Sequence, residues 1–231
     1  KQAFILIFTG DKEVWEIVFL TIKVSGIATI ISMLIGIPLG FFTGLNQFHG
    51  KKILVSFINT GMGLPPVAAG LMVALLLWRS GPLGFMAIMY TPTAMVIAQI
   101  LIATPLIAGI TMAAVAQVNP KLKLMAVSLG AGRLSMSWLL FKEAKLPALS
   151  AIIAGFGGVI SEVGAVMMVG GNIKGSTRVL TTSTVQMVRM GELEMAIAMV
   201  LILLFLTFLV NFILTIIQQQ DKEKWQVKYW K

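Results

Sequence analysis

The chain has 231 residues, of which 58% are hydrophobic and only 12% are charged. A soluble domain of this length needs far more charge to cover its surface, so the composition indicates an integral membrane protein. The formal net charge is +9, but the basic residues lie in loops between apolar runs, which argues against a nucleic-acid-binding face. The chain has no Cys and a single His, His49, so the sequence predicts no disulfide and no metal site.

Five apolar stretches reach or approach the length of about 20 residues that a membrane-spanning helix needs. We therefore expect an all-α integral membrane protein with five transmembrane helices, forming a single domain over residues 1–220 with a short tail at 221–231. The predicted spans are Glu13–Gly44, Ile53–Trp78, Pro92–Gln117, Pro147–Val169 and Met195–Gln218.

The distribution of Lys and Arg predicts the orientation, because basic residues accumulate on the cytoplasmic side. Basic residues concentrate in the loop after the first span, in the loop after the third, and in the tail. With five spans, this places the N-terminus outside and the C-terminus in the cytoplasm. The basic residues are Lys51 and Lys52, then Lys121, Lys123, Arg133, Lys142 and Lys145, then Lys222, Lys224, Lys228 and Lys231.

Two consecutive prolines, Pro65 and Pro66, interrupt the second span. They remove two backbone donors and bend or break a helix. Inside a membrane the freed carbonyl groups need a cavity or a protein partner. Two interpretations stay open: a kink that shapes the bundle, or a kink that lines a pore.

Glu162 lies within the fourth apolar run, in the sequence Ser161-Glu162-Val163-Gly164. A carboxylate at membrane depth is costly and usually faces the bundle interior or a watery path. We interpret Ser161, Glu162 and Gly164 as part of a path or gate. The alternative is a structural Glu that hydrogen-bonds a neighbouring helix. A charged Glu would repel an anionic substrate, in which case a gate or hinge role fits better than substrate binding.

The segment after this span, 170–178, combines glycines, hydroxyl groups and two cations. Backbone N–H groups and cations together suit an oxyanion in transit. A solvated loop that meets an extracytoplasmic partner is the other interpretation. The candidate residues of this outer loop are Gly171, Asn172, Lys174 and Arg178.

The sequence contains no nucleotide-binding loop of the GxxxxGK[ST] type and no set of Ser, His and Asp residues for acyl transfer. We therefore expect a transport subunit rather than an enzyme, with no cofactor of its own. Any ATP must be bound by another chain.

A long, basic and less apolar insert, at about 118–146, separates the third and fourth spans. Its helical pattern with a Gly at a bend, on the positive side of the membrane, is typical of a docking element for a cytoplasmic partner. The candidate docking residues are Ala126, Gly130, Ala131, Gly132 and Arg133.

This insert resembles the EAA loop of permease subunits in binding-protein-dependent ABC importers of the type I fold. Gly130 fits the conserved Gly of that loop, Ala126 its second Ala, and Leu146-Pro147 its ending. Leu124 and Met125 replace the usual Glu and first Ala, and the Leu-Pro pair falls four residues later than usual. In that family the short helix of the loop docks in a cleft of the ATPase.

Three segments are similar to the oxyanion branch of this family: Leu129-Gly130-Ala131-Gly132-Arg133, Ser161-Glu162-Val163-Gly164-Ala165 and Gly171-Asn172. The run from Ser161 to Gly175, with Lys142-Glu143-Ala144 before it, is most similar to tungstate permeases.

The resemblance implies half of a homodimeric permease in a prokaryotic inner membrane. It also implies a pair of cytoplasmic ATPase subunits and an extracytoplasmic tungstate-binding protein as partners. The alternatives are a molybdate or sulfate permease, an ATPase-independent channel or proton-coupled carrier built around Glu162, and a membrane scaffold protein.

Overall fold

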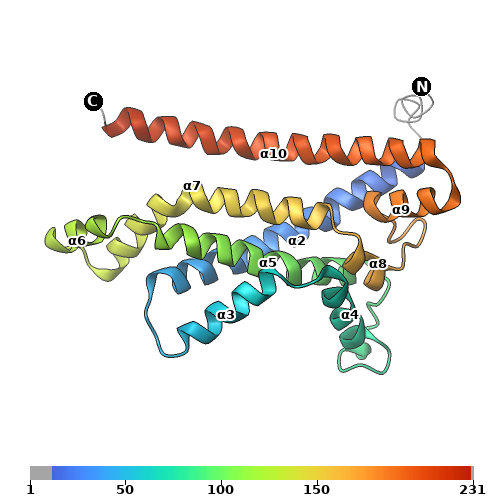
Figure 1. Cartoon of the computed structure of the whole chain (residues 1–231), viewed down its shortest axis with the longest axis horizontal. Helices are drawn as coiled ribbons and strands as arrows, with labels where there is room; N and C mark the ends of the chain where they lie inside the picture. Colours follow the sequence, from blue (N-terminus) through green and yellow to red (C-terminus); the bar gives the residue numbers. More distant parts are fainter. Residues whose placement is uncertain (1–11, 230–231) are drawn as a thin grey trace. The chain divides into compact units, whose positions relative to one another are not determined.

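A computed structural model of the chain describes residues 12–229; for 120, 123, 133, 134, 137, 147 and 220–229 it describes only the backbone. Every regular element in this part of the chain is a helix (Figure 1). The elements are α2 (Lys12–Leu45), α3 (Lys51–Met62), α4 (Pro66–Leu77), the 3₁₀ turn η1 (Gly84–Met86), α5 (Pro92–Ala116), α6 (Pro120–Ser128), α7 (Arg133–Ile160), α8 (Gly164–Gly170), α9 (Leu180–Met190) and α10 (Leu193–Tyr229).

Three of these helices, α2, α5 and α10, are each long and apolar enough to cross a membrane. Two bent helix pairs, α3 with α4 and the two halves of α7, raise the number to five if each pair forms one span. This agrees with the predicted five spans. The most apolar 18-residue window of α10 has no buried residue, as expected of a helix that faces lipid.

The second span is broken at Pro65 and Pro66, as predicted from the sequence. Helix α3 ends at Met62, and α4 begins with Pro66 in its first turn. Proline is tolerated there because its missing N–H would have no partner inside the helix. The fixed φ of Pro65, −59°, with ψ at 125°, sets the extended entry into α4.

The fourth span differs from the predicted stretch Pro147–Val169. Helix α7 passes through Pro147 with a bend of 51° and stops at Ile160, and α8 restarts at Gly164. A proline inside a helix removes one backbone hydrogen bond and kinks the helix without necessarily ending it. The insert and the fourth span are therefore continuous through α7, and the real break lies beside Glu162.

The chain divides into two compact units, each built from three segments. Within the described residues, unit 1 comprises 12–31, 64–103 and 156–212, and unit 2 comprises 32–63, 104–155 and 213–229. The core of unit 1 consists of small and branched side chains from α2, α4, α5 and α8, including Val24, Val73, Met95, Ala165 and Val169.

In unit 2, a stripe of glycines four residues apart lets α2 approach α5 closely. A Cβ added to Gly36 would lie 2.9 Å from the Thr104 carbonyl oxygen, and one added to Gly40 would collide with the carbonyl oxygen of Ala108. Small residues at such contacts allow tight helix packing in membranes. A second cluster, formed by Ala126, Met136 and Leu140, joins α6 to α7.

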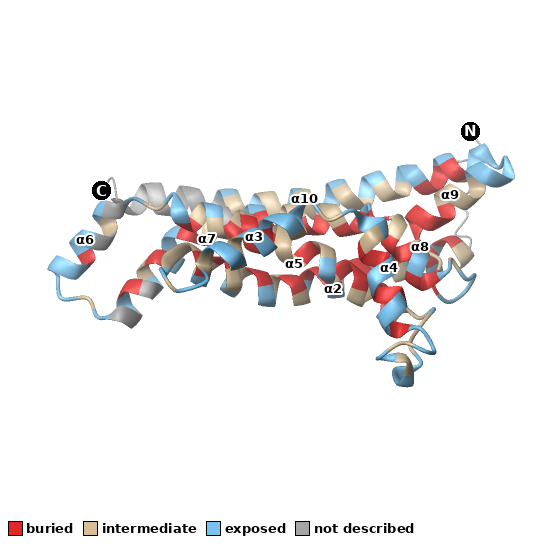
Figure 2. Ribbon diagram, turned by 60° about the horizontal axis from the view of Figure 1, so that its bottom comes forward, coloured by how far each residue is buried: buried red, intermediate tan, exposed pale blue. Residues whose placement is uncertain are grey.

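Figure 2 shows where burial concentrates: buried residues gather on α4, α5 and α8, whereas α6 is mostly exposed. The described chain therefore has a densely packed region around α8 and an exposed insert at α6. The candidate residues fall in these two regions.

Candidate translocation and coupling sites

The break between α7 and α8, residues 161–163, exposes backbone groups that would be costly to leave unpaired in a membrane. Two side chains from other helices supply partners. Gln99 of α5 donates through Nε2 to the Val159 carbonyl at 3.0 Å, and Thr181 of α9 donates through Oγ1 to the Glu162 carbonyl at 3.0 Å. The break is thus held by the surrounding helices of unit 1.

Glu162 is 8% exposed, and its carboxylate closes the first turn of α8. Its Oε1 accepts a hydrogen bond from the Ala165 N–H at 2.8 Å. A carboxylate at this position satisfies a donor that the helix cannot and complements the positive end of the helix dipole. Ser161, which is exposed, donates from Oγ to the Gly157 carbonyl at 2.7 Å in the last turn of α7.

The two interrupted spans meet in unit 1, because α4 packs against α8. A Cβ added to Gly164 would lie 2.7 Å from Cγ2 of Val67, the residue after Pro66. One added to Gly70 would lie 2.6 Å from the Cα of Ala165. The structure therefore brings the predicted residues Pro65, Pro66, Ser161, Glu162 and Gly164 to one region where two broken helices touch.

The outer loop folds on itself rather than forming an open cradle of N–H groups. The backbone N–H groups of Ser176, Thr177 and Arg178 all approach the Ile173 carbonyl, at 3.1, 2.9 and 3.1 Å. Thr177 is fully buried, and its hydroxyl accepts from the Ile173 N–H and donates to the Gly170 carbonyl. These N–H groups are therefore occupied within the loop.

The other predicted outer-loop residues fix the path of the chain. Gly171 and Asn172 adopt positive φ values of 70° and 52°, a conformation that Gly and Asn accept more readily than other residues. The Asn172 side chain donates to Gln186 of α9 at 2.6 Å. Asn172 thus ties the loop to α9, and Gly171 ends α8.

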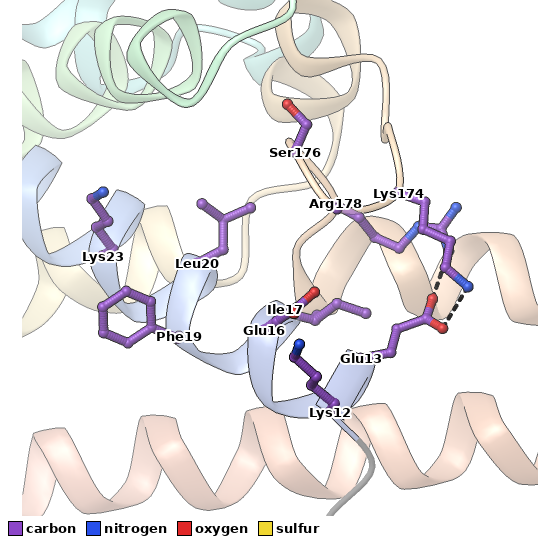
Figure 3. Close-up of a pocket in the computed structure, with 11 residues that line it drawn as sticks. Lys12, Glu13, Glu16, Ile17, Phe19, Leu20, Lys23, Lys174, Ser176 and Arg178 are labelled. Atoms are coloured by element: carbon purple, nitrogen blue, oxygen red, sulfur yellow. Dashed lines mark hydrogen bonds and ion pairs between the residues drawn. The ribbon is translucent and has the colours of Figure 1, made fainter.

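The two cations of this loop share one carboxylate at the start of α2, as Figure 3 shows. Lys174 Nζ lies 2.6 Å from Glu13 Oε2, and Arg178 Nη1 lies 3.4 Å from Glu13 Oε1. Lys174 remains largely exposed, whereas the side chain of Arg178 is only 11% exposed. The sequence did not identify Glu13 as the partner of these cations, because Glu13 and Arg178 are separated by 165 positions in the chain.

The insert contains the predicted helix with a bend at Gly130. Asn119 caps α6, because its Oδ1 accepts a hydrogen bond from the Lys121 N–H at 2.9 Å. At the other end, the N–H of Gly130 bonds the Val127 carbonyl and the N–H of Ala131 bonds the Ala126 carbonyl, both at 2.9 Å. This is the Schellman arrangement, which needs a left-handed residue, and Gly130 has φ of 78°.

The candidate docking residues have different surroundings. Ala126 is buried against Met136 and Leu140, so it attaches α6 to α7 and is not available for contact. Ala131 is half-buried, whereas Gly130 and Gly132 are exposed with open space around them. The side chain of Arg133 lies outside the described residues.

The sequence analysis missed four exposed apolar side chains around α6. Leu124, Met125, Val127 and Leu129 are 67, 63, 59 and 78% exposed. The signal in the sequence that could have identified them is the presence of apolar residues between polar ones in a basic insert. We interpret these four exposed side chains as a candidate interaction surface.

Comparison with known proteins identifies relatives over nearly the whole chain. Residues 36–220 match the family described as "binding-protein-dependent transport system inner membrane component". The chain is 41% identical over 220 residues to the tungstate uptake system permease protein TupB of Peptoclostridium acidaminophilum, covering 95% of this chain and 96% of that protein. It is 38% identical over 210 residues to a probable anion ABC transporter permease protein of Haloferax volcanii, covering 87% and 90%.

A solved structure supports the fold independently. The chain superposes on a crystal structure of an amino acid ABC transporter with a TM-score of 0.71, covering 94% of this chain and 98% of the other. The sequence identity is 21%, so the likeness concerns the fold alone. The predicted type I permease fold is confirmed.

Proposed function

The chain belongs to the family of inner membrane components of binding-protein-dependent transport systems, and from this premise we propose that it forms the path by which tungstate crosses the membrane. The chain is a transport subunit rather than an enzyme, because its relatives are permease subunits of ABC transporters. The observation that supports tungstate as the substrate is the 41% identity to a tungstate uptake permease over almost all of both chains.

The family places the chain in an inner membrane beside an ATPase and a binding protein. We infer further that two copies of the chain enclose the path and that two ATPase subunits dock on their inserts. The exposed patch Leu124, Met125, Val127 and Leu129 supports this inference, since apolar side chains on a basic loop fit an apolar cleft in a soluble partner. We also propose that the N-terminus lies outside and the C-terminus in the cytoplasm.

The proposed mechanism is alternating access by rigid-body motion. ATP, bound by the partner subunits and not by this chain, would draw the ATPases together and move α6. Because α6 is fixed to α7 through Ala126, Met136 and Leu140, its motion would pass into the membrane helices. Glu162 would set the geometry of the break beside the path rather than bind the anion.

Molybdate and sulfate remain the alternative substrates. All three are tetrahedral dianions, and the pocket that separates them belongs to the extracytoplasmic binding protein in this scheme. An ATPase-independent channel or proton-coupled carrier would leave the exposed patch on α6 without a partner.

Purification of the tagged chain from its native membrane in mild detergent, followed by mass spectrometry, tests the importer assignment. We expect an ATPase to accompany the chain at about one copy per permease. A homo-oligomer without an ATPase, reproduced under cross-linking, would favour a channel or carrier.

A further inference from the structure

Lys23 interrupts an otherwise uncharged stretch of α2. From Ile17 to Gly50 it is the only Asp, Glu, Lys or Arg residue. It lies eleven residues, or about 16 Å, along the helix from Lys12. A lysine so far inside a membrane span is costly and points to a functional role, with a partner of opposite charge.

The residues that the structure describes contain no such partner. Lys23 is exposed and forms no ion pair or hydrogen bond with any of them. It shares one face of α2 with Lys12 and Glu16, because positions i, i+4 and i+11 align on a helix. This face borders a hollow in unit 1.

The hollow has a volume of about 530 Å³ and is lined by Lys12, Glu16 and Lys23 from α2 and by Lys174, Ser176 and Arg178 from the outer loop. Figure 3 shows Lys23 on one side of it and the Lys174–Glu13–Arg178 group on the other, with Ser176 on the loop between them. Four cations and two carboxylates, Glu13 and Glu16, border this space. Its formal charge is therefore +2, the complement of a tetrahedral dianion.

Arg178 adds a second sign that this space favours an anion. Its Nε is buried and has no hydrogen-bond partner among the described residues, although its Nη1 reaches Glu13. Buried guanidinium donors normally find acceptors. An anion in the hollow would supply one, and it would compete with Glu13 for Lys174 and Arg178.

We propose that this hollow is a binding site for the transported oxyanion in the permease, with Lys23 as its inner ligand, Lys174 and Arg178 as its outer ligands, and Glu13 as the internal anion that occupies the cations when substrate is absent. The inference rests on the proposed function for the identity of the anion. The cationic site itself depends only on the geometry. It assigns a direct role in substrate binding to a helix face that the sequence analysis did not single out.

Equilibrium dialysis of the purified permease–ATPase complex tests the site. The complex is dialysed against tungstate in phosphate-free buffer without the binding protein, and bound tungsten is measured by mass spectrometry. Lys23→Gln should weaken binding about tenfold to a hundredfold, the usual effect of losing a charge-assisted bond. Lys23→Arg should retain binding, and Lys52→Gln, an exposed lysine outside the hollow, should match the wild type.

Glu13→Gln should change tungstate affinity in the opposite direction to Lys23→Gln. Removal of the competing carboxylate should tighten tungstate binding, whereas a merely structural ion pair would give no gain. Lys174→Gln, at an exposed loop position, replaces Lys23→Gln if the latter does not retain the ATPase.

Wild-type binding that persists in Lys23→Gln and Lys174→Gln, or an absence of binding by the wild type, would overturn the site. Loss of tungstate binding on adding phosphatidylglycerol, but not phosphatidylcholine, would assign the hollow to lipid phosphate instead and equally overturn it. Lys23-dependent binding of molybdate or sulfate but not tungstate would retain the site and refute the tungstate assignment. Normal tungstate transport by Lys23→Gln would refute the site and leave the proposed function intact.

Discussion

The break beside Glu162 and the bend at Gly130 both depend on glycine, but for different physical reasons. At the break, a Cβ on Gly164 or Gly70 would collide with Val67 or with the backbone of Ala165. At the bend, no described atom beyond the two chain neighbours lies within 4 Å of the position that a Gly130 Cβ would take, and the requirement is the left-handed φ of 78°. The first region needs space, and the second needs a backbone conformation.

The two regions also differ in whether their exposed groups have partners within the described chain. The freed carbonyl groups of Val159 and Glu162 accept hydrogen bonds from side chains of α5 and α9, and the freed N–H of Ala165 in α8 donates to the Glu162 carboxylate. The insert instead presents Leu124, Met125, Val127 and Leu129 without cover. The break is therefore assembled within the described chain, whereas the insert exposes apolar side chains at the place where we propose that the ATPase docks.

The largest effect should come from filling the contact between α4 and α8. Gly70→Ala places a Cβ 2.6 Å from the Ala165 Cα and forces the helices apart, at a cost of about 1–3 kcal/mol. Gly157→Ala is the matched control, since that helical position is open and Ala favours a helix. Thermal unfolding in detergent should show a lower midpoint only for the first variant; equal midpoints would refute the close packing.

The effect of a substitution at Gly130 should depend on how well the new residue tolerates positive φ rather than on its volume. Gly130→Ala should cost about 1–2 kcal/mol locally, because an L-residue is strained in the left-handed region. Gly130→Asn should be milder, and Gly132→Ala, at an open position, should be near neutral. Comparable ATP hydrolysis by the complexes of Gly130→Ala and Gly132→Ala would contradict this role.

Gly130→Asp tests the docking surface itself, because Asp tolerates positive φ but adds a charge beside the exposed patch. We expect membrane insertion to be preserved and ATPase coupling to be lost, as measured by transport and by the amount of ATPase that accompanies the chain. Normal transport in this variant would remove the docking assignment.

The exposed patch should contribute binding energy without contributing to the fold. Leu129→Ala removes a 78% exposed side chain and should weaken ATPase association by about 1–2 kcal/mol, near tenfold. Leu204→Ala, a 59% exposed leucine on α10, is the control. Titration of purified ATPase onto both variants would show the difference, and equal affinities would place the docking surface elsewhere.

The smallest effect on stability should be at Glu162, where two substitutions distinguish the loss of the hydrogen-bond acceptor from the loss of the charge. Glu162→Ala loses the acceptor for the Ala165 N–H, costs about 1 kcal/mol, and should impair transport more than assembly. Glu162→Gln keeps a side-chain oxygen there and should retain most of the transport. If Gln proved as defective as Ala, the charge itself would be required; if Ala abolished folding, Glu162 would be structural only.

The spans and their interruptions were largely predictable from the sequence. Apolar length identified the five spans, Pro65 and Pro66 located the break in the second, and Gly130 located the bend in the insert. These features are local, because a proline or a left-handed glycine acts on its own backbone. Pro147 misled the prediction, since a proline kinks a helix without ending it when the residues on both sides continue the helix.

The contacts that shape the sites were not predictable in this way. Glu13 meets Lys174 and Arg178, and Gln99 meets Val159, across separations that no periodicity encodes. Lys23 did carry a local signal, a lone charge in an apolar run on one helix face with Lys12 and Glu16. Its significance depends on the outer loop, which lies about 150 residues further along the chain and which only the tertiary fold brings beside α2.

The proposed tungstate import can be measured after reconstitution of the permease with its ATPase and binding protein in proteoliposomes, with uptake of tungstate and molybdate followed side by side. We expect ATP-dependent accumulation of tungstate that requires all three components and is lost in Gly130→Asp. Tungstate uptake that is independent of ATP and of the insert would contradict it.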